Sequence, residues 1–330
     1  MAALQSAVSD KVQGSASYID DFEAAESGIS ILQPSAWTLS AVPKGMKGYG
    51  KSGQVEAGYN RALLNWFTID PLFTRRNSPL TPAHIKTDLE QLSNHYVREV
   101  YERELYPNKE STSSESTTLQ ILNLAYYPNE RGPYNLNPNL DADGHLPDPQ
   151  DNWGGIMRRL TTTDFEVANI EYIEFWMLDP FIYNQSAAGG DLYLNLGEVS
   201  EDVLLDGKKF FENGIPVDGD SAKWASTVWG KVPTGKSLVY AFDNNAADSR
   251  DRQDVGLNGL SSDEERSWPA YASYLSQIRS KVKPEVYQAI YDDPAADTYH
   301  YYRGADYDDA RLSVMDRYRK YNGTEGNSPN

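Results

Sequence analysis

The chain has 330 residues, and 48 acidic against 30 basic residues give it a formal net charge of −18 and a pI near 4.6. A field of that sign repels nucleic acid and anionic lipid surfaces, so it argues against DNA, RNA and membrane surfaces as partners. Cysteine is absent, which excludes disulfides, thiolate metal sites and cysteine nucleophiles. The start does not resemble a signal peptide, and no apolar run approaches the roughly 18 residues of a membrane-spanning helix.

The first part of the chain is predicted to contain a linker followed by strands. Residues 1–16 are small and polar and are expected to form a flexible linker. The sequence IDDFE at residues 19–23, with Trp37 some way on, is similar to the start of jelly-roll modules of the galactose-binding type. Alternating polarity predicts a strand over residues 37–41, and a second strand is predicted over residues 62–69.

A helix is predicted next. Thr81 and Pro82 are typical of a helix start, and apolar residues then recur at steps of three and four as far as about Tyr106. Residues 119–126 return to a strand pattern, and residues 136–152 are predicted to form a long irregular loop because they are rich in Asn, Asp and Pro.

The most apolar part of the chain is NIEYIEFWMLDPF at residues 169–181. Its β-branched and aromatic residues predict a central strand buried on both faces. In residues 191–197 leucines alternate with polar side chains, which predicts a strand with one solvated face. Ser200 is predicted to cap a helix that ends near Gly214.

From residue 243 onward the chain changes to acidic loops, with short helices predicted near residues 263–280 and 308–321. The predicted fold is mainly β with α. It consists of a jelly-roll-like, galactose-binding-type β-sandwich over residues 17–242, with a helical insertion at about 81–106, and a loop-and-helix extension over 243–330.

One acidic segment fits the twelve-residue calcium-loop template, in which hard oxygen ligands surround a sharp glycine turn. The predicted ligands to a structural calcium ion are the side chains of Asp254, Asn258 and Glu265, the carbonyl of Leu260, and Ser262 directly or through water. Gly256 departs from the template because it removes one side-chain ligand. The alternative is a solvated turn followed by a helix whose acidic first turn suits the helix dipole.

Two further clusters have weaker patterns. Asp20, Asp21 and Glu23 form an acidic opening of the kind that helps to bind a structural cation in jelly-roll modules, or else a solvated turn. Near the end of the chain, an exposed aromatic cluster is predicted to form a protein interface rather than a sugar site, with the members Tyr299, Tyr301, Tyr302 and Arg303.

The sequence predicts neither catalysis nor nucleotide binding. A nucleophile elbow is missing from the sequence. Residues 45–53, GMKGYGKSG, have the glycine spacing of a P-loop and of a dinucleotide fingerprint, but no helix is predicted directly after them, and both motifs require one. Glu171 and Glu174 are three positions apart, so on a strand they point to opposite faces and cannot act as a catalytic pair. The chain is therefore predicted not to be an enzyme.

Several long sequence words resemble the SprA family, whose members are outer-membrane translocons of the type 9 secretion system linked to gliding motility. The words are FTIDPLFTRRN (67–77), QLSNHYVREVY (91–101), LAYYPNERGPYN (124–135), WGGIMR (153–158), NIEYIEFWMLDPF (169–181), GDLYLNLG (190–197) and QDVGLNGL (253–260). Because family members are several times longer, the chain resembles one internal segment.

The resemblance implies a segment that supports protein export by shaping the pore or by contacting partners and cargo of the secretion system. It implies an outer-membrane association, on the extracellular rather than the periplasmic face, with membrane contact only through the rest of the full-length protein. A carbohydrate-binding jelly-roll module that recognises surface glycans is the alternative, and a glycoside hydrolase with two facing carboxylates is a third interpretation.

Overall fold

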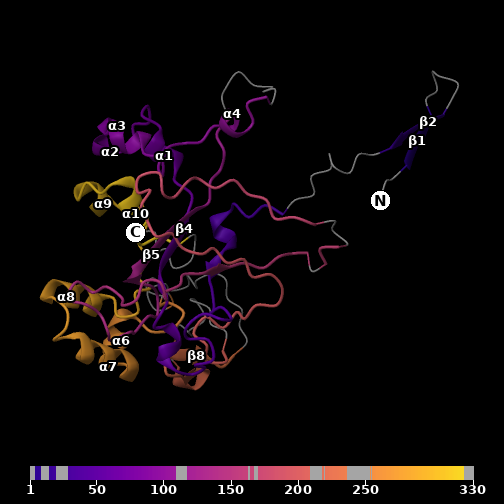
Figure 1. Ribbon diagram of the computed structural model, residues 1–330. Coiled ribbons are helices and arrows are strands. Elements are labelled where there is room, and N and C mark those ends of the chain that lie inside the picture. The colour runs from indigo at the N-terminus through magenta and orange to yellow at the C-terminus, as the bar shows by residue number, and fades with distance from the viewer. Residues whose placement is uncertain are drawn as a thin grey trace. The chain divides into compact units, whose positions relative to one another are not determined.

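The computed structural model describes residues 4–8, 15–19, 29–108, 117–162, 164–166, 170–208, 218, 220–235, 253 and 255–322 (Figure 1). The chain divides into two compact units, one made of residues 1–31 and 159–178, the other of residues 32–158 and 179–330. In the first unit, strands β1 (Leu4–Val8) and β2 (Ser15–Ile19) pair antiparallel. The other described helices and strands belong to the second unit.

The strands of the second unit pair two by two. β4 (Ala62–Phe67) pairs with β5 (Asn123–Arg131), and the remaining antiparallel pairs are β3 (Thr38–Leu39) with β6 (Ile156–Met157) and β7 (Trp224–Ser226) with β8 (Lys231–Pro233). The described residues thus form a mixed α/β architecture of helices and small antiparallel sheets. Within them the jelly-roll sandwich is not confirmed, although the strand predicted at residues 62–69 is present as β4.

The helix predicted over residues 81–106 is broken into short pieces, so that prediction of one continuous helix was wrong. The pieces are α2 (Ala83–Thr87), α3 (Leu89–Ser93) and α4 (Glu102–Leu105), and α1 (Pro71–Thr74) precedes them. Asp88 accepts a hydrogen bond from the Gln91 N–H at 2.9 Å, and Asn94 accepts one from the Tyr96 N–H at 2.9 Å. Such local side-chain bonds compete with helix continuation, and they fall at the breaks.

The C-terminal part is mainly helical, as predicted for residues 263–280. It contains α6 (Ser262–Ser267), α7 (Pro269–Ile278), α8 (Pro284–Asp292), α9 (Ala305–Asp309) and α10 (Val314–Arg317), and short 3-10 turns occur elsewhere at Pro34–Ala36, Val55–Gly58 and Ser221–Lys223. Ser261 and Glu264 form a reciprocal capping box at the start of α6, and prolines open α7 and α8.

Strand β4 separates two hydrophobic cores, because neighbouring strand residues point to opposite faces. Trp66 belongs to the main core with Tyr134, Trp229, Tyr271 and Leu275, all of them buried. Phe67 belongs to a second core that is formed with Phe73, Ile85, Val97, Val314 and Tyr318. Figure 1 shows the yellow helices α9 and α10 beside α1–α3, and a contact of His84 Nε2 with the Leu312 carbonyl at 3.1 Å joins these segments.

Two predicted strands in the middle of the chain are not formed, and the described part of a predicted helix is not helical. Residues 170–181 and 191–197 lie outside every strand and helix, and the described residues after Ser200 form turns rather than a helix. Alternating or apolar sequence becomes a strand only where a neighbouring strand supplies hydrogen-bond partners. The composition of residues 170–181 and 191–197 is strand-like, but the predictions of a strand buried on both faces and of a strand with one solvated face were wrong.

Candidate functional site

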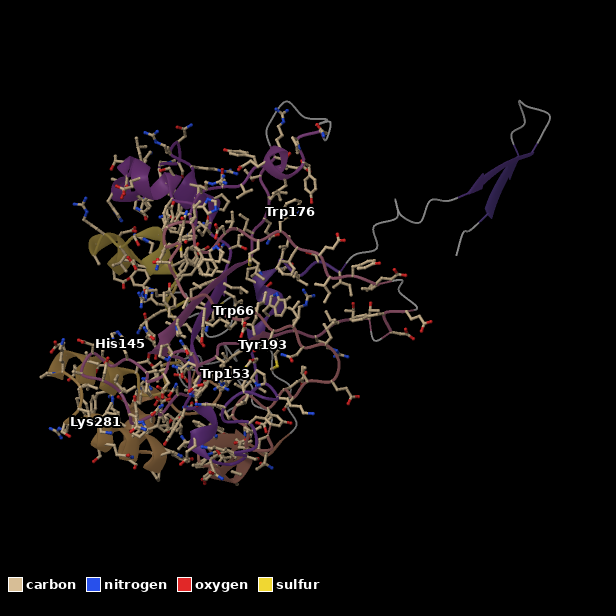
Figure 2. The ribbon with its side chains drawn as sticks, in the orientation of Figure 1. Trp66, His145, Trp153, Trp176, Tyr193 and Lys281 are labelled. Carbon is tan, nitrogen blue, oxygen red and sulfur yellow. The ribbon has the colours of Figure 1, made fainter. Side chains whose placement is uncertain are left out.

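The first exposed segment consists of residues 170–178 and belongs to the first unit. All residues from 171 to 177 are exposed, with exposed fractions of 77% for Tyr172, 70% for Trp176 and 67% for Met177. Figure 2 shows Trp176 on this segment. Contiguous exposed apolar surface of this kind marks an interaction site in a soluble domain.

The second exposed segment consists of residues 191–199 and belongs to the second unit. Leu192, Leu194 and Leu196 are 62%, 57% and 58% exposed, and they alternate with Tyr193 and other polar residues. The alternation gives an extended chain one apolar side and one polar side. The leucine side therefore has the composition of a buried sheet face but is open to solvent.

Residues 180–183, between the two exposed segments in sequence, are anchored to the connection that follows α3. The Tyr96 hydroxyl donates to the Pro180 carbonyl at 2.8 Å, and the His95 N–H donates to the Tyr183 hydroxyl at 2.7 Å. The Tyr96 and Tyr183 rings also meet edge to face, with centroids 5.3 Å apart. This anchor fixes the chain where it enters the second unit, and the neighbouring segments stay uncovered.

The predicted calcium loop lies partly in the main core. Asp254 lies outside the described residues, whereas Asn258, Leu260 and Glu265 are buried and Ser262 is half-buried in the first turn of α6. The Asn258 side-chain nitrogen donates to Glu265 Oε1 at 2.5 Å and to the Tyr271 hydroxyl at 2.9 Å. Its side-chain oxygen accepts from the Leu260 N–H at 3.0 Å. The structure therefore brings Asn258 and Glu265 together directly.

Glu265 joins three segments of the main core. Its second oxygen accepts from the Ala295 N–H at 3.0 Å. The pKa of Glu265 is raised to about 9, because burial and, to a smaller extent, the charge of Asp297 outweigh the hydrogen bonds from Asn258 and Ala295 that lower it. Among the described residues no group of three or more His, Asp or Glu side chains is arranged to hold a metal ion. The calcium site, which needs Asp254, remains a prediction.

The second predicted cation site cannot be compared with the structure in the same way. Asp20, Asp21 and Glu23 lie outside the residues that the structure describes. Their predicted role therefore stays a prediction.

The predicted aromatic interface makes contacts inside the chain. The Tyr302 ring stacks on Tyr318 with centroids 4.9 Å apart, its hydroxyl donates to Asp70 Oδ2 at 2.9 Å, and Arg303 forms an ion pair with the same carboxylate. Tyr299 and Tyr301 are half-buried neighbours. Tyr302 and Arg303 thus hold the C-terminal helices against the start of α1, and a role of this cluster in binding another protein remains a prediction.

Asp70 was not singled out as a site residue, although the Asp-Pro pair before α1 is a helix-start signal. It caps α1 by accepting from the Leu72 N–H at 2.8 Å. Burial raises the pKa of Asp70, but hydrogen bonds from Leu72, Arg303 and Tyr302 outweigh burial and hold the pKa below its ordinary value.

Two buried arginines were also missed by the sequence analysis. Arg61 is 1% exposed, and its guanidinium donates to the carbonyls of Val203 at 2.7 Å and Pro133 at 3.2 Å. Burial lowers the pKa of Arg61 to about 10. Arg317 is 0% exposed and donates to the carbonyl of Tyr307 at 3.1 Å. The burial of Arg61 could have been suspected from its position in the sequence, because it directly precedes the apolar run of β4.

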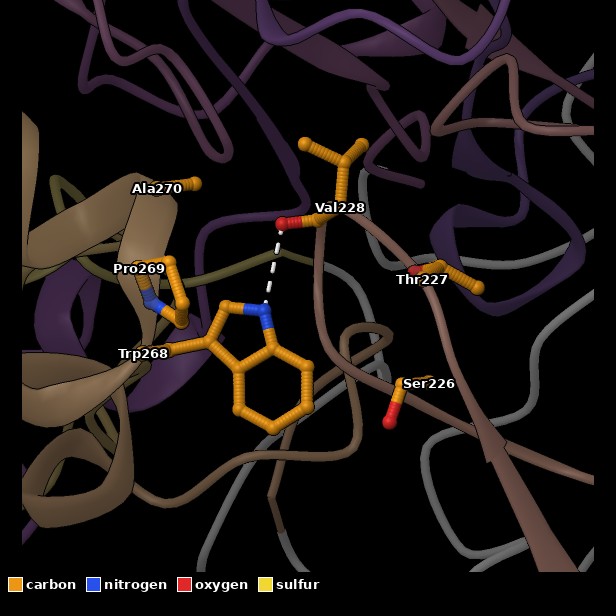
Figure 3. Close-up of a pocket in the computed structure, with 6 residues that line it drawn as sticks. All are labelled: Ser226, Thr227, Val228, Trp268, Pro269 and Ala270. Carbon is orange, nitrogen blue, oxygen red and sulfur yellow. Dashed lines mark hydrogen bonds between the residues drawn. The ribbon is translucent and has the colours of Figure 1, made fainter.

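An open hollow lies between the end of β7 and the start of α7 (Figure 3). It is lined by Ser226, Thr227, Val228, Trp268, Pro269 and Ala270. The Trp268 indole N–H donates to the Val228 carbonyl at 3.2 Å, so the indole is fixed along one wall. The lining offers apolar contact and no titratable side chain, which suits a contact surface rather than acid-base chemistry.

Comparison with known families finds a match in the C-terminal part of the chain. Residues 273–330, from within α7 to beyond α10, match the SprA_N family, described as motility related/secretion protein. The resemblance to the SprA family is confirmed. The SprA_N match includes Tyr302, Arg303 and Arg317, and it connects the chain with a secretion or motility-related role. No curated protein matches the chain. Within the described residues, no helix is long and apolar enough to cross a membrane.

Proposed function

We propose that this chain is a non-enzymatic segment of a type 9 secretion outer-membrane translocon. It supports protein export to the cell surface and gliding motility by shaping the pore or by contacting partner subunits and cargo, on the extracellular side. The SprA_N match supports the secretion and motility role. The observation that carries the contact role is the exposure of residues 171–177 and of the leucines of residues 191–197.

The charged groups of the second unit support a binding role rather than catalysis. Glu265 has the carboxyl pKa raised furthest, to about 9, but it is 0% exposed and is bound by Asn258 and Ala295. Arg61 and Arg317 are likewise used to join distant carbonyls. A catalytic acid or base must reach a substrate in a cleft. These groups instead hold the core together.

The test is an export assay in cells that make the full-length protein. Tyr172→Ser, Phe175→Ser and Trp176→Ser in combination remove the largest aromatic groups of the first exposed segment. We expect the variant to accumulate to normal levels while surface delivery of cargo and gliding both fall. A matched control replaces the exposed Tyr49, Tyr101 and Tyr106 by serine, since these are 53%, 40% and 44% exposed and lie outside the segment. Normal export by the first variant would contradict the proposal.

The exposure of Trp176 and Tyr172 also favours the glycan-binding alternative, because sugar rings stack on exposed aromatic faces. Titration of the chain with surface polysaccharide from the producing cell, followed by tryptophan fluorescence, separates the two. Saturable binding that is lost in Trp176→Ser, together with normal export by the same variant, would favour the glycan module. Lost export without glycan binding would favour the translocon segment.

A further inference from the structure

A basic loop lies on the second unit of a chain whose formal net charge is −18. It consists of residues 44–53 and carries Lys44, Lys47 and Lys51, all of them exposed. The sequence has no Asp or Glu in residues 27–55, although about one residue in seven of the whole chain is acidic. The loop is therefore a local reversal of the charge that dominates the chain.

Two of the three lysines have no paired carboxylate. Lys47 forms an ion pair with Asp151, whereas Lys44 and Lys51 form no ion pair with any residue that the structure describes. The next acid along the chain, Glu56, is half-buried in the turn that follows the loop. The basic loop therefore presents two exposed ammonium groups that are available to an anionic partner.

Hydrogen bonds to distant segments hold the basic loop in place. The Trp153 indole N–H donates to the Lys47 carbonyl at 3.2 Å. The Gly53 N–H and the Ser52 hydroxyl both donate to the Leu205 carbonyl, at 2.7 Å and 3.1 Å. Both halves of the loop are thus anchored to the second unit, and rigid anchoring of an exposed loop is typical of binding sites.

The acids beside Leu205 are occupied by other contacts. The Asp202 carboxylate accepts the N–H groups of Asp206 and Gly207 at 3.1 Å and 2.7 Å, and the Asp206 carboxylate accepts the Lys208 N–H at 3.0 Å. They form no described ion pair with a lysine of the basic loop, so the positive charge of the loop is not cancelled from this side.

The basic loop has the glycine spacing of a P-loop but not its structure. A P-loop cradles phosphate with backbone N–H groups in front of a helix. Here the N–H groups of Met46, Tyr49 and Lys51 donate to carbonyls three residues back, and the Ser52 hydroxyl donates to Leu205. The element that follows is a 3-10 turn of four residues. The loop therefore offers ammonium groups rather than a backbone cradle for phosphate.

We infer that the basic loop binds a short acidic segment of a partner protein, with carboxylates placed against Lys44 and Lys51. The inference goes beyond the proposed contact role, because it concerns residues other than the two exposed segments. Complementary charge of this kind determines which partner is accepted and how fast it associates.

The charge of the whole chain selects a short partner. A net charge of −18 repels a membrane or a polysaccharide that carries many anionic groups, and the repulsion grows with the charge of the partner. Charges farther away than the Debye length of about 8–10 Å are largely screened. A short segment with few carboxylates therefore responds mainly to the lysines that it touches.

The experiment measures binding of the intact chain by calorimetry to a synthetic peptide in which glutamate alternates with serine. The control peptide has glutamine in place of glutamate. Lys44→Gln with Lys51→Gln tests the basic loop. Arg76→Gln with Arg103→Gln is the matched control variant, because these side chains are exposed, lie outside the loop and change the net charge equally.

We expect the glutamate peptide to bind and the glutamine peptide not to bind, with an affinity that falls as salt rises. The lysine variant should bind at least about threefold more weakly, because each exposed ion pair contributes modestly. The arginine variant should bind like the unmodified chain. Equal losses in the two variants would overturn the inference, because they would show that only the net charge matters.

A glycine substitution tests the fixed loop without changing charge. Gly48 has φ +95°, and an added Cβ would lie 2.3 Å from the Ala57 carbonyl oxygen, whereas Gly45 has φ +91° and nothing within 4 Å. Gly48→Ala should weaken peptide binding about twofold or more, because the loop must shift, and Gly45→Ala should weaken it less. Thermal melts verify that both variants fold, and equal binding by folded variants would overturn the role of the fixed loop.

Two further probes address other anions. Tighter binding of inorganic tripolyphosphate than of the glutamate peptide would overturn the carboxylate partner in favour of phosphate. Binding to phosphatidylglycerol vesicles that the lysine variant loses would overturn it in favour of a membrane. If nothing binds, the inference is wrong and the proposed function stands, because the export assay tests other residues. If export by the aromatic variant is normal, the proposed function fails and peptide binding by the loop is unaffected.

Discussion

Two regions of this protein are both rich in aromatic side chains, but those side chains are buried in one region and exposed in the other. In residues 255–322 the aromatics are packed, as in Tyr271 and Tyr318, which are 0% and 1% exposed. In residues 170–199 they are open to solvent, as in Tyr172 and Trp176. The first region meets β4 and its neighbours within the same chain, whereas the second has strand-like composition without a paired strand. An apolar sequence therefore predicts that a segment tends to be buried, but it does not indicate whether the same chain or another polypeptide buries it.

The largest effect is expected from opening the packed region. Trp66→Ala removes a fully buried indole from the main core, so we expect the free energy of unfolding to fall by about 3–5 kcal/mol. Urea denaturation followed by circular dichroism measures the change. A loss below about 1 kcal/mol would mean that the core around β4 is not closely packed.

The loop before α6 tests how tightly the packed region is built. Gly256 has φ +68°, and an added Cβ would lie 2.1 Å from Asp297 Oδ2. Gly53 has φ +72° with nothing within 4 Å of the added Cβ, so it is the matched control. Gly53→Ala should cost about 1–2 kcal/mol for the backbone conformation alone. Gly256→Ala should cost about 1–3 kcal/mol more for the clash, and equal losses in thermal melts would contradict this packing.

Glu265 should make the packed region sensitive to pH. Its folded pKa of about 9 lies above the ordinary value of 4.5, so folding favours the protonated form. The stabilisation is complete below the unfolded pKa and is lost as the pH rises through about 9. We expect the unfolding free energy of the unmodified chain to fall more steeply than that of Glu265→Gln between about pH 5 and about pH 9. Parallel profiles would show that Glu265 titrates normally.

Binding of calcium to the loop that contains Asp254 and Glu265 should stabilise the fold. If Asp254 completes the predicted site, calcium at a hundredfold excess over Kd should raise the unfolding free energy by about 2.7 kcal/mol. Thermal melts with calcium and with chelator measure the rise, which Asp254→Asn should remove. Asp263→Asn is the control, because that side chain is 86% exposed and is not a predicted ligand. Identical melts in all conditions would leave a hydrogen-bonded core loop without metal.

The smallest effect is expected in the exposed region. Trp176 is 70% exposed, so Trp176→Ala should change the unfolding free energy by no more than about 0.5 kcal/mol. The same denaturation experiment as for Trp66→Ala gives a direct comparison of two tryptophans. A loss of several kcal/mol would mean that the segment is packed in solution, and the contrast between the regions would disappear.

The sequence predicted elements best where their signals were local. Strand β4 follows from an apolar run, and α6 begins with the acidic first turn that the sequence indicated for a helix near residues 263–280. Local bonds of Asp88 and Asn94 broke the helix predicted over 81–106, because side-chain competition does not appear in an apolar periodicity.

Among the candidate sites, the acidic loop before α6 was recognised from the spacing of its residues, but the sequence did not predict that the loop is buried. Asn258 and Glu265 bond to each other in a core that is assembled from distant segments, and Ala295 closes that cluster. The roles of Arg61 and Arg317 could not be predicted for the same reason, since their acceptors, among them the Val203 carbonyl for Arg61 and the Asp308 carboxylate for Arg317, come together only in the fold.

The buried amide of Asn65 links the early part of the chain to its far end. Its side-chain nitrogen donates to the carbonyls of Arg319 at 2.8 Å and Tyr321 at 3.1 Å, although about 250 residues separate them. During synthesis β4 leaves the ribosome long before these acceptors exist. The interior around β4 therefore becomes complete only when residue 321 has emerged, and a chain cut short before residue 319 leaves the buried amide nitrogen of Asn65 without either acceptor.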